Sequence, residues 1–192
     1  MISIRRARPA DAAAIGLVHV TAWRSAYPGI LPDAYLARLS PVRHAAQYEA
    51  SIRAGLGVHV AVASGPDLPP GQDAPRGSLV VGFVTVGPAR RRAGVVAPAE
   101  GEIETLYVLD DWRDRGVGRR LMRAAATRLA ADGCASAFVW VLRDNPNRWF
   151  YAHLGGRPAA ESTIQVGGEP VVQTAYVWSP IDKLTQATSA TL

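Results

Sequence analysis

The sequence predicts an α/β fold in a single domain. Residues 2–6, 58–63, 79–86 and 102–108 show the apolar alternation of strands, while residues 11–25 place apolar side chains at helical spacing. The length of 192 residues suits one domain and is short for two, and 48% hydrophobic residues predict a buried core. Strand and helix patterns alternate along the chain, which is the mark of the α/β class.

In the first half of the chain, the helix at residues 11–25 is predicted by Ile15, Val18 and Ala22 on one face. Short helical pieces follow up to about residue 53. The segment 65–78 is rich in Pro, Gly and Asp and offers little that could be buried, so we expect a mobile connection between two strands rather than a domain boundary.

The centre of the chain reads as strand, turn and helix over residues 102–132. Leu121, Ala125 and Leu129 fall on one face of the predicted helix, and Gly133 ends it. Between strand and helix stands the sequence Arg-Asp-Arg-Gly-Val-Gly, residues 113–118.

The last third predicts a buried strand at residues 135–142 and a short helix that starts near Pro146 and stops before Gly155. A hairpin follows, with strands at 157–166 and 171–178 and a glycine pair at its turn. Residues 183–192 are polar and small. We therefore expect one domain over residues 1–182 and a disordered tail over 183–192.

The loop at residues 113–118 has the chemistry of a phosphate site. Glycines allow a tight turn, the first N–H groups of a helix lack intrahelical partners, and neighbouring arginines add positive charge. A Walker loop is excluded because Gly118 is followed by two arginines, and a dinucleotide fingerprint is excluded because Leu121 stands where a small residue is needed. The alternative is an ordinary glycine turn into an arginine-rich surface helix.

The Arg-x-x-Gly-x-Gly pattern, after a strand that ends Leu-Tyr-Val, resembles the acetyl-CoA loop of the GNAT acyltransferase superfamily. A second stretch, Asn-x-x-x-x-Phe-Tyr-x-x-Leu-Gly at residues 145–155, is similar to that family's second cofactor segment. Two departures stand out. The interval from Asn145 to Tyr151 is one residue shorter than in many members, and Gly156 replaces a common Phe.

The resemblance implies a mixed, mostly antiparallel twisted sheet of about six to seven strands flanked by helices. It also implies acetyl-CoA as the acyl donor. The backbone of Leu106, Tyr107 and Val108 would pair with the pantetheine arm, and Asn145 would lie near that arm. The residues implied to hold the pyrophosphate are Arg113, Asp114, Arg115, Gly116, Val117, Gly118 and Arg119.

The implied reaction is direct transfer of acetyl from acetyl-CoA to a primary amine of a small molecule or a peptide N-terminus. Glu102 stands at the family's usual strand glutamate and would be the base. Two-residue alternation puts Glu104 and Leu106 on the same strand face as Glu102, and Glu104 is the alternative base. Tyr151 would protonate the leaving thiolate. Without catalysis, the glutamates would be solvated strand residues and Tyr151 a core tyrosine.

Trp23 and Tyr27 lie in an aromatic, proline-punctuated loop that also resembles one branch of small GNAT enzymes. These two side chains would form a wall of the acceptor pocket, and the alternative is that they belong to the core. No pattern identifies the acceptor, which could be a small amine, an antibiotic, a polyamine or a protein N-terminus.

Other functions find less support. A non-catalytic acyl-CoA-binding domain, acting as a sensor or accessory, remains the alternative to an enzyme. The net charge of +5 is spread along the chain and no nucleic-acid recognition motif accompanies it. The four histidines and Cys134 show no metal-type spacing, and no GxSxG elbow is present.

The sequence gives a few indications of the cellular compartment and none of a particular oligomeric state. No apolar run reaches the roughly 20 residues that a membrane span requires, and no secretory signal is expected. The single cysteine fits the reducing cytosol. A homodimer is compatible with the sequence, as is a monomer.

Overall fold

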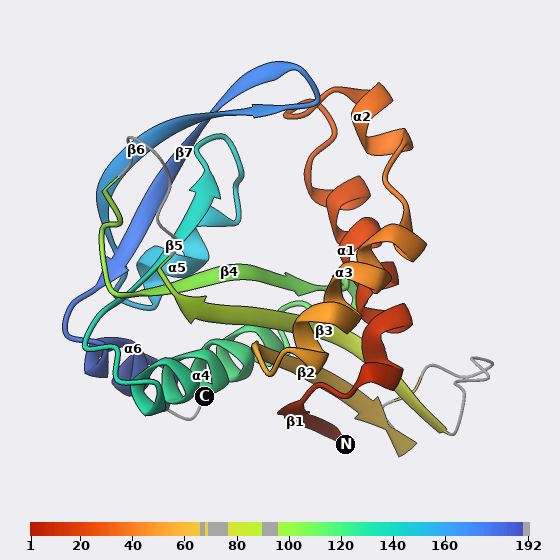
Figure 1. Ribbon diagram of the computed structural model, residues 1–192, viewed down its shortest axis with the longest axis horizontal. Helices are drawn as coiled ribbons and strands as arrows, with labels where there is room; N and C mark the ends of the chain where they lie inside the picture. The colour runs from red at the N-terminus through yellow and green to blue at the C-terminus, as the bar shows by residue number, and fades with distance from the viewer. Residues whose placement is uncertain (66–67, 69–76, 90–95, 190–192) are drawn as a thin grey trace.

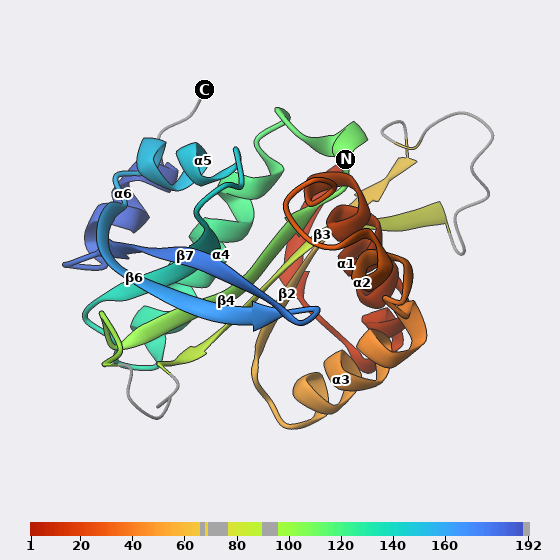
Figure 2. The same cartoon turned by 90° about the horizontal axis from the view of Figure 1, so that it is seen from above.

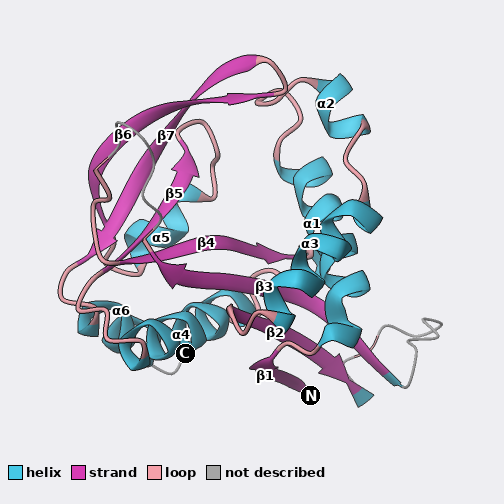
Figure 3. Ribbon diagram, viewed as in Figure 1, coloured by secondary structure: helices cyan, strands magenta, loops and turns pink. Residues whose placement is uncertain are grey.

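The computed structural model describes residues 1–65, 68, 77–89 and 96–189. They form a seven-stranded sheet in the order β1-β2-β3-β4-β5-β7-β6, which confirms the predicted α/β fold (Figures 1 and 3). The strands are β1 Ile2–Arg6, β2 Gly57–Ser64, β3 Ser78–Pro88, β4 Gly101–Val108, β5 Ala137–Leu142, β6 Arg157–Val166 and β7 Glu169–Trp178.

Helices cover both faces of this sheet. In the described part of the chain they are α1 Ala12–Ala26, α2 Asp33–Ala37, α3 Pro41–Arg53, α4 Val117–Ala131, α5 Arg148–His153 and α6 Asp182–Ser189. The first and third pack together on one face, while α4 and α6 pack on the other (Figure 2). The sheet is therefore the middle of three layers.

One strand pair differs from the rest. All other neighbours are antiparallel, but β4 and β5 run parallel, which the crossover through α4 makes possible. Their pairing covers only residues 101–103 of β4 and 137–139 of β5. Beyond that point the two strands diverge and leave an opening in the middle of the sheet (Figure 1).

The predicted alternation along β4 is wrong, because the strand contains a β-bulge. Thr105 pairs with Thr85 and Ile103 pairs with Val86, so Glu104 is an extra residue on β4. After a bulge the two-residue period shifts, so Glu104 does not share the face of Leu106. Leu106 packs with the core beneath α4. Glu104 lies on the opposite face, where its Oε1 is 3.7 Å from the position of a Cβ built on Gly87.

The core beneath α4 follows the predicted helical stripe. Leu121, Ala125 and Leu129 are fully buried, as their spacing indicated. The tail from residue 183, in contrast, is not disordered as expected: up to Ser189 it forms α6, which packs on α4 and buries Leu184 completely. Residues 190–192 lie outside the described part, as do most of the predicted connection at 65–78 and the arginine run at 90–92.

Candidate active site

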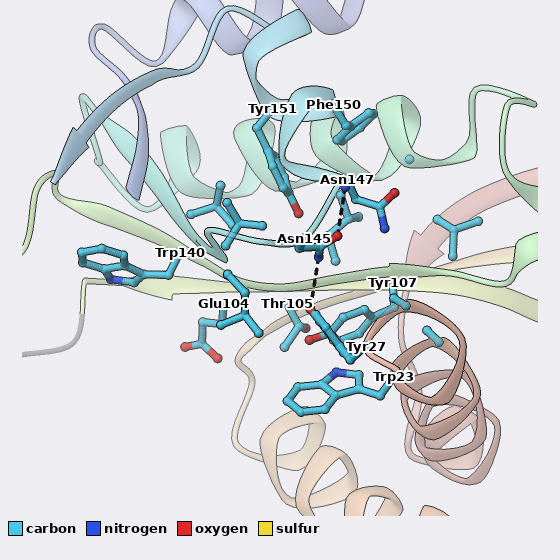
Figure 4. Close-up of a pocket in the computed structure, with 18 of the residues that line it drawn as sticks. Trp23, Tyr27, Glu104, Thr105, Tyr107, Trp140, Asn145, Asn147, Phe150 and Tyr151 are labelled. Atoms are coloured by element: carbon cyan, nitrogen blue, oxygen red, sulfur yellow. Dashed lines mark hydrogen bonds between the residues drawn. The ribbon is translucent and has the colours of Figure 1, made fainter. Parts of the chain in front are cut away.

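A cavity of about 600 Å³ lies where β4 and β5 diverge. It is lined by both strands, the start of α4, the end of α1, α5 and the inner side of β6. Figure 4 shows Phe150 and Tyr151 reaching it from α5, with Trp23, Tyr27 and Tyr107 on the other side of the strand. Most of the predicted site residues therefore meet in one place.

The loop before α4 turns through left-handed backbone. Asp114 has φ 57° and Gly116, the residue that caps the helix, has φ 72°. The hydrogen bonding of the helix begins with Arg120 N–H donating to the Gly116 carbonyl, 3.1 Å between N and O. The N–H groups of Val117 and Gly118 precede that bond and lie at the cavity wall, at the positive end of the helix dipole.

The three arginines of this loop are placed differently. Arg113 lines the cavity and forms an ion pair with Asp110 at 2.8 Å, and Arg119 also lines the cavity. The guanidinium of Arg115 instead lies over the ring of Trp112, 5.1 Å from its centroid, outside the cavity lining. Two of the three predicted cations thus face the space that an anion would occupy.

One edge of β4 faces the cavity. Among the described residues, β4 continues to pair with β3 up to Val108, while its pairing with β5 stops at Ile103. Leu106, Tyr107 and Val108 line the cavity along the edge that β5 has left. Backbone N–H and C=O groups on such an edge can accept an extended ligand as if it were another strand.

Two carboxylates line the same cavity near the point where the strands separate. Glu102 is only 4% exposed and pairs with Phe138 of β5 and Gly87 of β3. Glu104, the bulge residue, is half-buried. The pKa of Tyr48 is raised mainly by burial of its phenol, and the charge of Glu104 raises it further. The site therefore has two candidate proton acceptors, which are two residues apart on β4.

Tyr151 enters the cavity from α5 and is 8% exposed. Its ring packs near Tyr176 and Trp178, with centroids 6.1 and 6.4 Å away. Burial raises the pKa of Tyr151 well above its ordinary value of 10, and the nearby Tyr27 raises it further. Its phenol therefore carries its proton at neutral pH and is a donor.

Asn145 ties α5 to α1. Its Oδ1 accepts a hydrogen bond from Asn147 N–H at 2.9 Å, and its Nδ2 donates to the Tyr27 hydroxyl at 3.4 Å (Figure 4). The side chain is buried and also lines the cavity. Asn147 lines the cavity as well and was missed by the sequence reasoning; its position four residues before Tyr151 is the signal that could have identified it.

The two residues expected to form an acceptor wall lie together at the cavity. Trp23 and Tyr27 both line the cavity, with ring centroids 4.9 Å apart in an edge-on contact. Burial raises the pKa of Tyr27, so its hydroxyl stays protonated. Further wall residues that the sequence did not reveal are Thr105, Trp140, Phe150, Ile164 and Val166, which come from four separate elements.

Within the described residues, no group of three or more metal-ligating side chains is close enough to hold an ion. No helix there combines the length and the apolar character needed to cross a bilayer.

Comparison with known proteins gives a consistent result. Residues 40–155 match the Acetyltransferase (GNAT) family. The uncharacterized N-acetyltransferase YuaI of Bacillus subtilis (strain 168) is 30% identical over 184 residues, covering 96% of each chain.

Two solved structures share the fold. An N-acetyltransferase from Staphylococcus aureus Mu50 is 18% identical with a TM-score of 0.65, covering 93% of this chain and 98% of that one. YncA, a putative acetyltransferase of Salmonella typhimurium whose structure contains acetyl-CoA, is 19% identical with a TM-score of 0.61, covering 93% of each chain. The chain belongs to the GNAT family of acetyltransferases and is an N-acetyltransferase-family enzyme.

Proposed function

We propose that the enzyme transfers acetyl from acetyl-CoA directly to a primary amine of a small molecule or a peptide N-terminus. The observation that carries this proposal is the arrangement along one cavity. The cavity is lined by a helix N-terminus and two arginines, and also by Glu102 and the protonated Tyr151. An anionic donor and a proton-transfer site would thus occupy one continuous space.

The donor would lie along the loop and the free edge of β4. The N–H groups at the start of α4, with Arg113 and Arg119 beside them, suit a pyrophosphate, and Asp114 would contribute through its left-handed backbone. Leu106, Tyr107 and Val108 would hydrogen-bond the two amides of the pantetheine arm. Asn145 borders the same space. Arg115 would contribute positive charge from outside the cavity.

The chemistry would need the nitrogen to lose two protons and the leaving sulfur to gain one. The acceptor arrives as an ammonium ion and must lose a proton before its nitrogen can attack the thioester carbonyl carbon, and Glu102 would accept that proton directly or through water. As the C–N bond forms, the attacking nitrogen becomes positively charged and releases its second proton to water. As the C–S bond breaks, the sulfur leaves as a thiolate. Tyr151 would protonate that sulfur, because burial keeps the phenol in its donor form, and would then regain a proton from water.

Glu102 is the preferred base for a structural reason. It is more deeply buried than Glu104 and lies at the last paired stretch between β4 and β5, where the strands begin to separate. Glu104 lies on the bulge, and its charge acts on Tyr48 of α3, which does not line the cavity. Glu104 remains the alternative base.

The proposal is tested by mixing the protein and acetyl-CoA with a panel of amines, peptides and aminoglycosides. Transfer releases one CoA thiol per acetyl group, which a thiol reagent detects. Thiol release that depends on both the protein and an amine, together with a mass increase of 42 Da on the amine, is the expected result, since acetyl replaces one hydrogen. Tight acetyl-CoA binding without any acceptor-dependent release would contradict the proposal.

A further inference from the structure

The β-bulge on β4 places the Thr105 hydroxyl on the wall of the cavity. Ile103 and Leu106 both pack in the core beneath α4. The residues between them, Glu104 and Thr105, therefore face the other side of the strand, as a bulge allows. Figure 4 shows both side chains on the side of β4 that also carries Trp23. A neutral hydroxyl thus lines the cavity next to a candidate base.

The Thr105 hydroxyl is the cavity end of a buried row of polar groups. Its oxygen lies 2.7 Å from the hydroxyl oxygen of Thr85 on β3. It also hydrogen-bonds the phenol of Tyr48 on α3, and that phenol lies 2.7 Å from Nδ1 of His19 on α1. Thr85, Tyr48 and His19 are buried and do not line the cavity. The row therefore joins the cavity wall to the interior between β4 and the two helices.

The protonation of Tyr48 indicates the direction of these hydrogen bonds. Burial raises the pKa of Tyr48, so the phenol keeps its proton at neutral pH, while the hydrogen bond with Thr105 acts to lower that pKa. A hydrogen bond that lowers the pKa is one that the phenolate also accepts, so the Thr105 O–H donates to the Tyr48 oxygen. The proton of Tyr48 is then donated to Nδ1 of His19.

His19 is suited to accept that proton in a hydrogen bond. Burial lowers the pKa of His19 to about 3, so the ring is neutral at neutral pH. Its Nε2 has no hydrogen-bond partner among the described residues, so the contact with Tyr48 alone determines which nitrogen carries the proton. With Nδ1 accepting, the proton is on Nε2.

This direction leaves Thr105 able only to accept further hydrogen bonds. Its own proton is donated to Tyr48, and of the two lone pairs on its oxygen one accepts from Thr85. The other lone pair remains for a ligand in the cavity. An amine N–H is the matching donor.

We propose that the Thr105 oxygen accepts a hydrogen bond from an N–H of the acceptor amine, and that Tyr48 and His19 are positioning residues that keep Thr105 in this role. The inference rests on the proposed function. The contact would restrict rotation of the nitrogen and help to aim its lone pair at the thioester carbonyl carbon. Without the Tyr48 hydroxyl, Thr105 would turn its own proton into the cavity and oppose the amine N–H.

The proton position on His19 can be measured without a ligand. Nitrogen NMR of the labelled protein at neutral pH should show a protonated Nε2 and an unprotonated Nδ1. The His19 signals are identified by their absence from the His19→Gln variant. A proton on Nδ1 would reverse the direction of the row and overturn the inference.

The role of Thr105 is tested by amine binding. Calorimetric titrations use n-butylamine and 2-phenylethylamine in the presence of CoA, which carries no acetyl group. The two probes have different bodies and the same primary ammonium group, so an effect seen with both belongs to the nitrogen. Thr105→Val should weaken the binding of each by about tenfold, whereas Thr105→Ser keeps the hydroxyl and should retain the affinity.

The role of Tyr48 is tested by a double-mutant cycle. Tyr48→Phe should weaken amine binding in the native background and have no further effect in Thr105→Val, because it acts through Thr105. Acetyl-CoA affinity should stay unchanged in both single variants. Tyr176→Phe removes the hydroxyl of another buried tyrosine outside the cavity lining and is the control.

Three binding results would contradict the inference. Native affinity in Thr105→Val, or no amine binding by the native protein, would overturn the role of Thr105. Additive losses in the double variant would overturn the role of Tyr48, since a purely structural effect adds to the loss of Thr105. Thiol release is measured separately. The expected binding pattern without any acetyl transfer would refute the proposed function and leave the Thr105 contact intact, so the two failures can be told apart.

Discussion

Gly116 and Gly118 stand two residues apart where α4 begins, and the structure favours glycine at each for a different reason. Gly116 has φ 72°, a conformation that side-chain-bearing residues rarely adopt, but the space around it is open. Gly118 lies in the helix, and a Cβ there would be 3.2 Å from the ring of Phe150 on α5. One glycine shapes the loop and the other lets two helices meet beside the cavity.

Gly118→Val should therefore weaken acetyl-CoA binding. The branched side chain must displace Phe150 or project into the cavity, where the proposed phosphate site lies. Gly116→Ala is the comparison for the backbone effect: its left-handed backbone should cost about 1–2 kcal/mol of stability, and the added Cβ would meet no neighbouring atom within 4 Å. Calorimetric titration with acetyl-CoA and urea unfolding would separate the two effects. A folded Gly118→Val variant with native affinity would mean that this loop is only a helix entry.

Tyr151 and Glu102 are expected to act on turnover rather than on donor affinity. Tyr151→Phe and Glu102→Gln should each lower kcat by roughly 100-fold or more, the scale of a general acid or base, with acetyl-CoA affinity nearly unchanged. Tyr176→Phe is a suitable control, because it removes a hydroxyl from a buried neighbouring ring that does not line the cavity.

The pH profile distinguishes the two proton-transfer positions. At higher pH more of the amine is already neutral, so the Glu102→Gln variant should regain rate as pH rises, whereas Tyr151→Phe should not. If Glu104→Gln shows the loss and recovery instead, the base is Glu104. Native turnover in all three variants would leave positioning as the source of the rate.

At the scale of single elements, local sequence patterns predicted the structure correctly where the spacing of apolar residues within one segment determined which side chains are buried. The stripe on α4 is such a case, and so is the left-handed turn before it. The faces of β4 could not be read the same way, because the bulge at Glu104 arises from pairing with Thr85 and Val86 about 20 residues away. No local pattern signals such a register shift. Alternation therefore assigned Leu106 to the face of Glu102 and Glu104, whereas Leu106 packs on the opposite face, beneath α4.

The C-terminal segment also could not be predicted from its own sequence pattern. Residues 182–189 are mostly polar, which favoured disorder, yet Leu184 and Thr188 are buried one helical turn apart. Packing against α4, a helix more than 50 positions earlier in the chain, stabilises the segment. Tertiary contact of this kind is how most helices in proteins gain their stability. The parts of α1 and β6 that line the cavity are likewise brought there by contacts between distant segments of the chain. Only residues that belong to sequence motifs could therefore be named in advance.

The packing of α1 on α3 should make the protein sensitive to acid. His19 on α1 is buried, its Nδ1 lies 2.7 Å from the Tyr48 hydroxyl, and its ring stacks on His44 at 3.9 Å. Phe83 and Tyr107 face it from the sheet. Burial, helped by the charge of His44, lowers the pKa of His19 from 6.5 to about 3.

Because the unfolded chain binds this proton more readily, the stabilisation is complete above pH 6.5 and is lost as pH falls towards 3. The slope from His19 alone approaches about 1.4 kcal/mol per pH unit within that window. Urea unfolding between pH 7.5 and 4.5 should show a shallower decline in His19→Phe, since the titrating group is gone. His153→Gln, at an exposed position, is the control. Parallel declines in all three proteins would refute the assignment.

Across the whole molecule, the net charge of +5 is carried by arginines spread along the chain, but the cavity concentrates its positive groups at one end. Arg113, Arg119 and the start of α4 surround the place proposed for the pyrophosphate. The opening between β4 and β5 extends from there towards the carboxylates. In the proposed function, donor and acceptor would lie along this gap in the sheet, so donor binding would be thermodynamically coupled to folding.

Acetyl-CoA should therefore stabilise the folded protein, by about 2.7 kcal/mol at a concentration 100 times Kd. Acetyl-pantetheine lacks the pyrophosphate and should stabilise it far less at the same concentration. Arg113→Gln should lower the affinity for acetyl-CoA while leaving acetyl-pantetheine binding unchanged, and added salt should weaken acetyl-CoA binding because exposed charges are screened. Arg157→Gln, an exposed arginine on β6, supplies the charge-matched control. Thermal unfolding with each ligand measures these effects. Equal stabilisation by both ligands would mean that the loop before α4 does not hold the pyrophosphate.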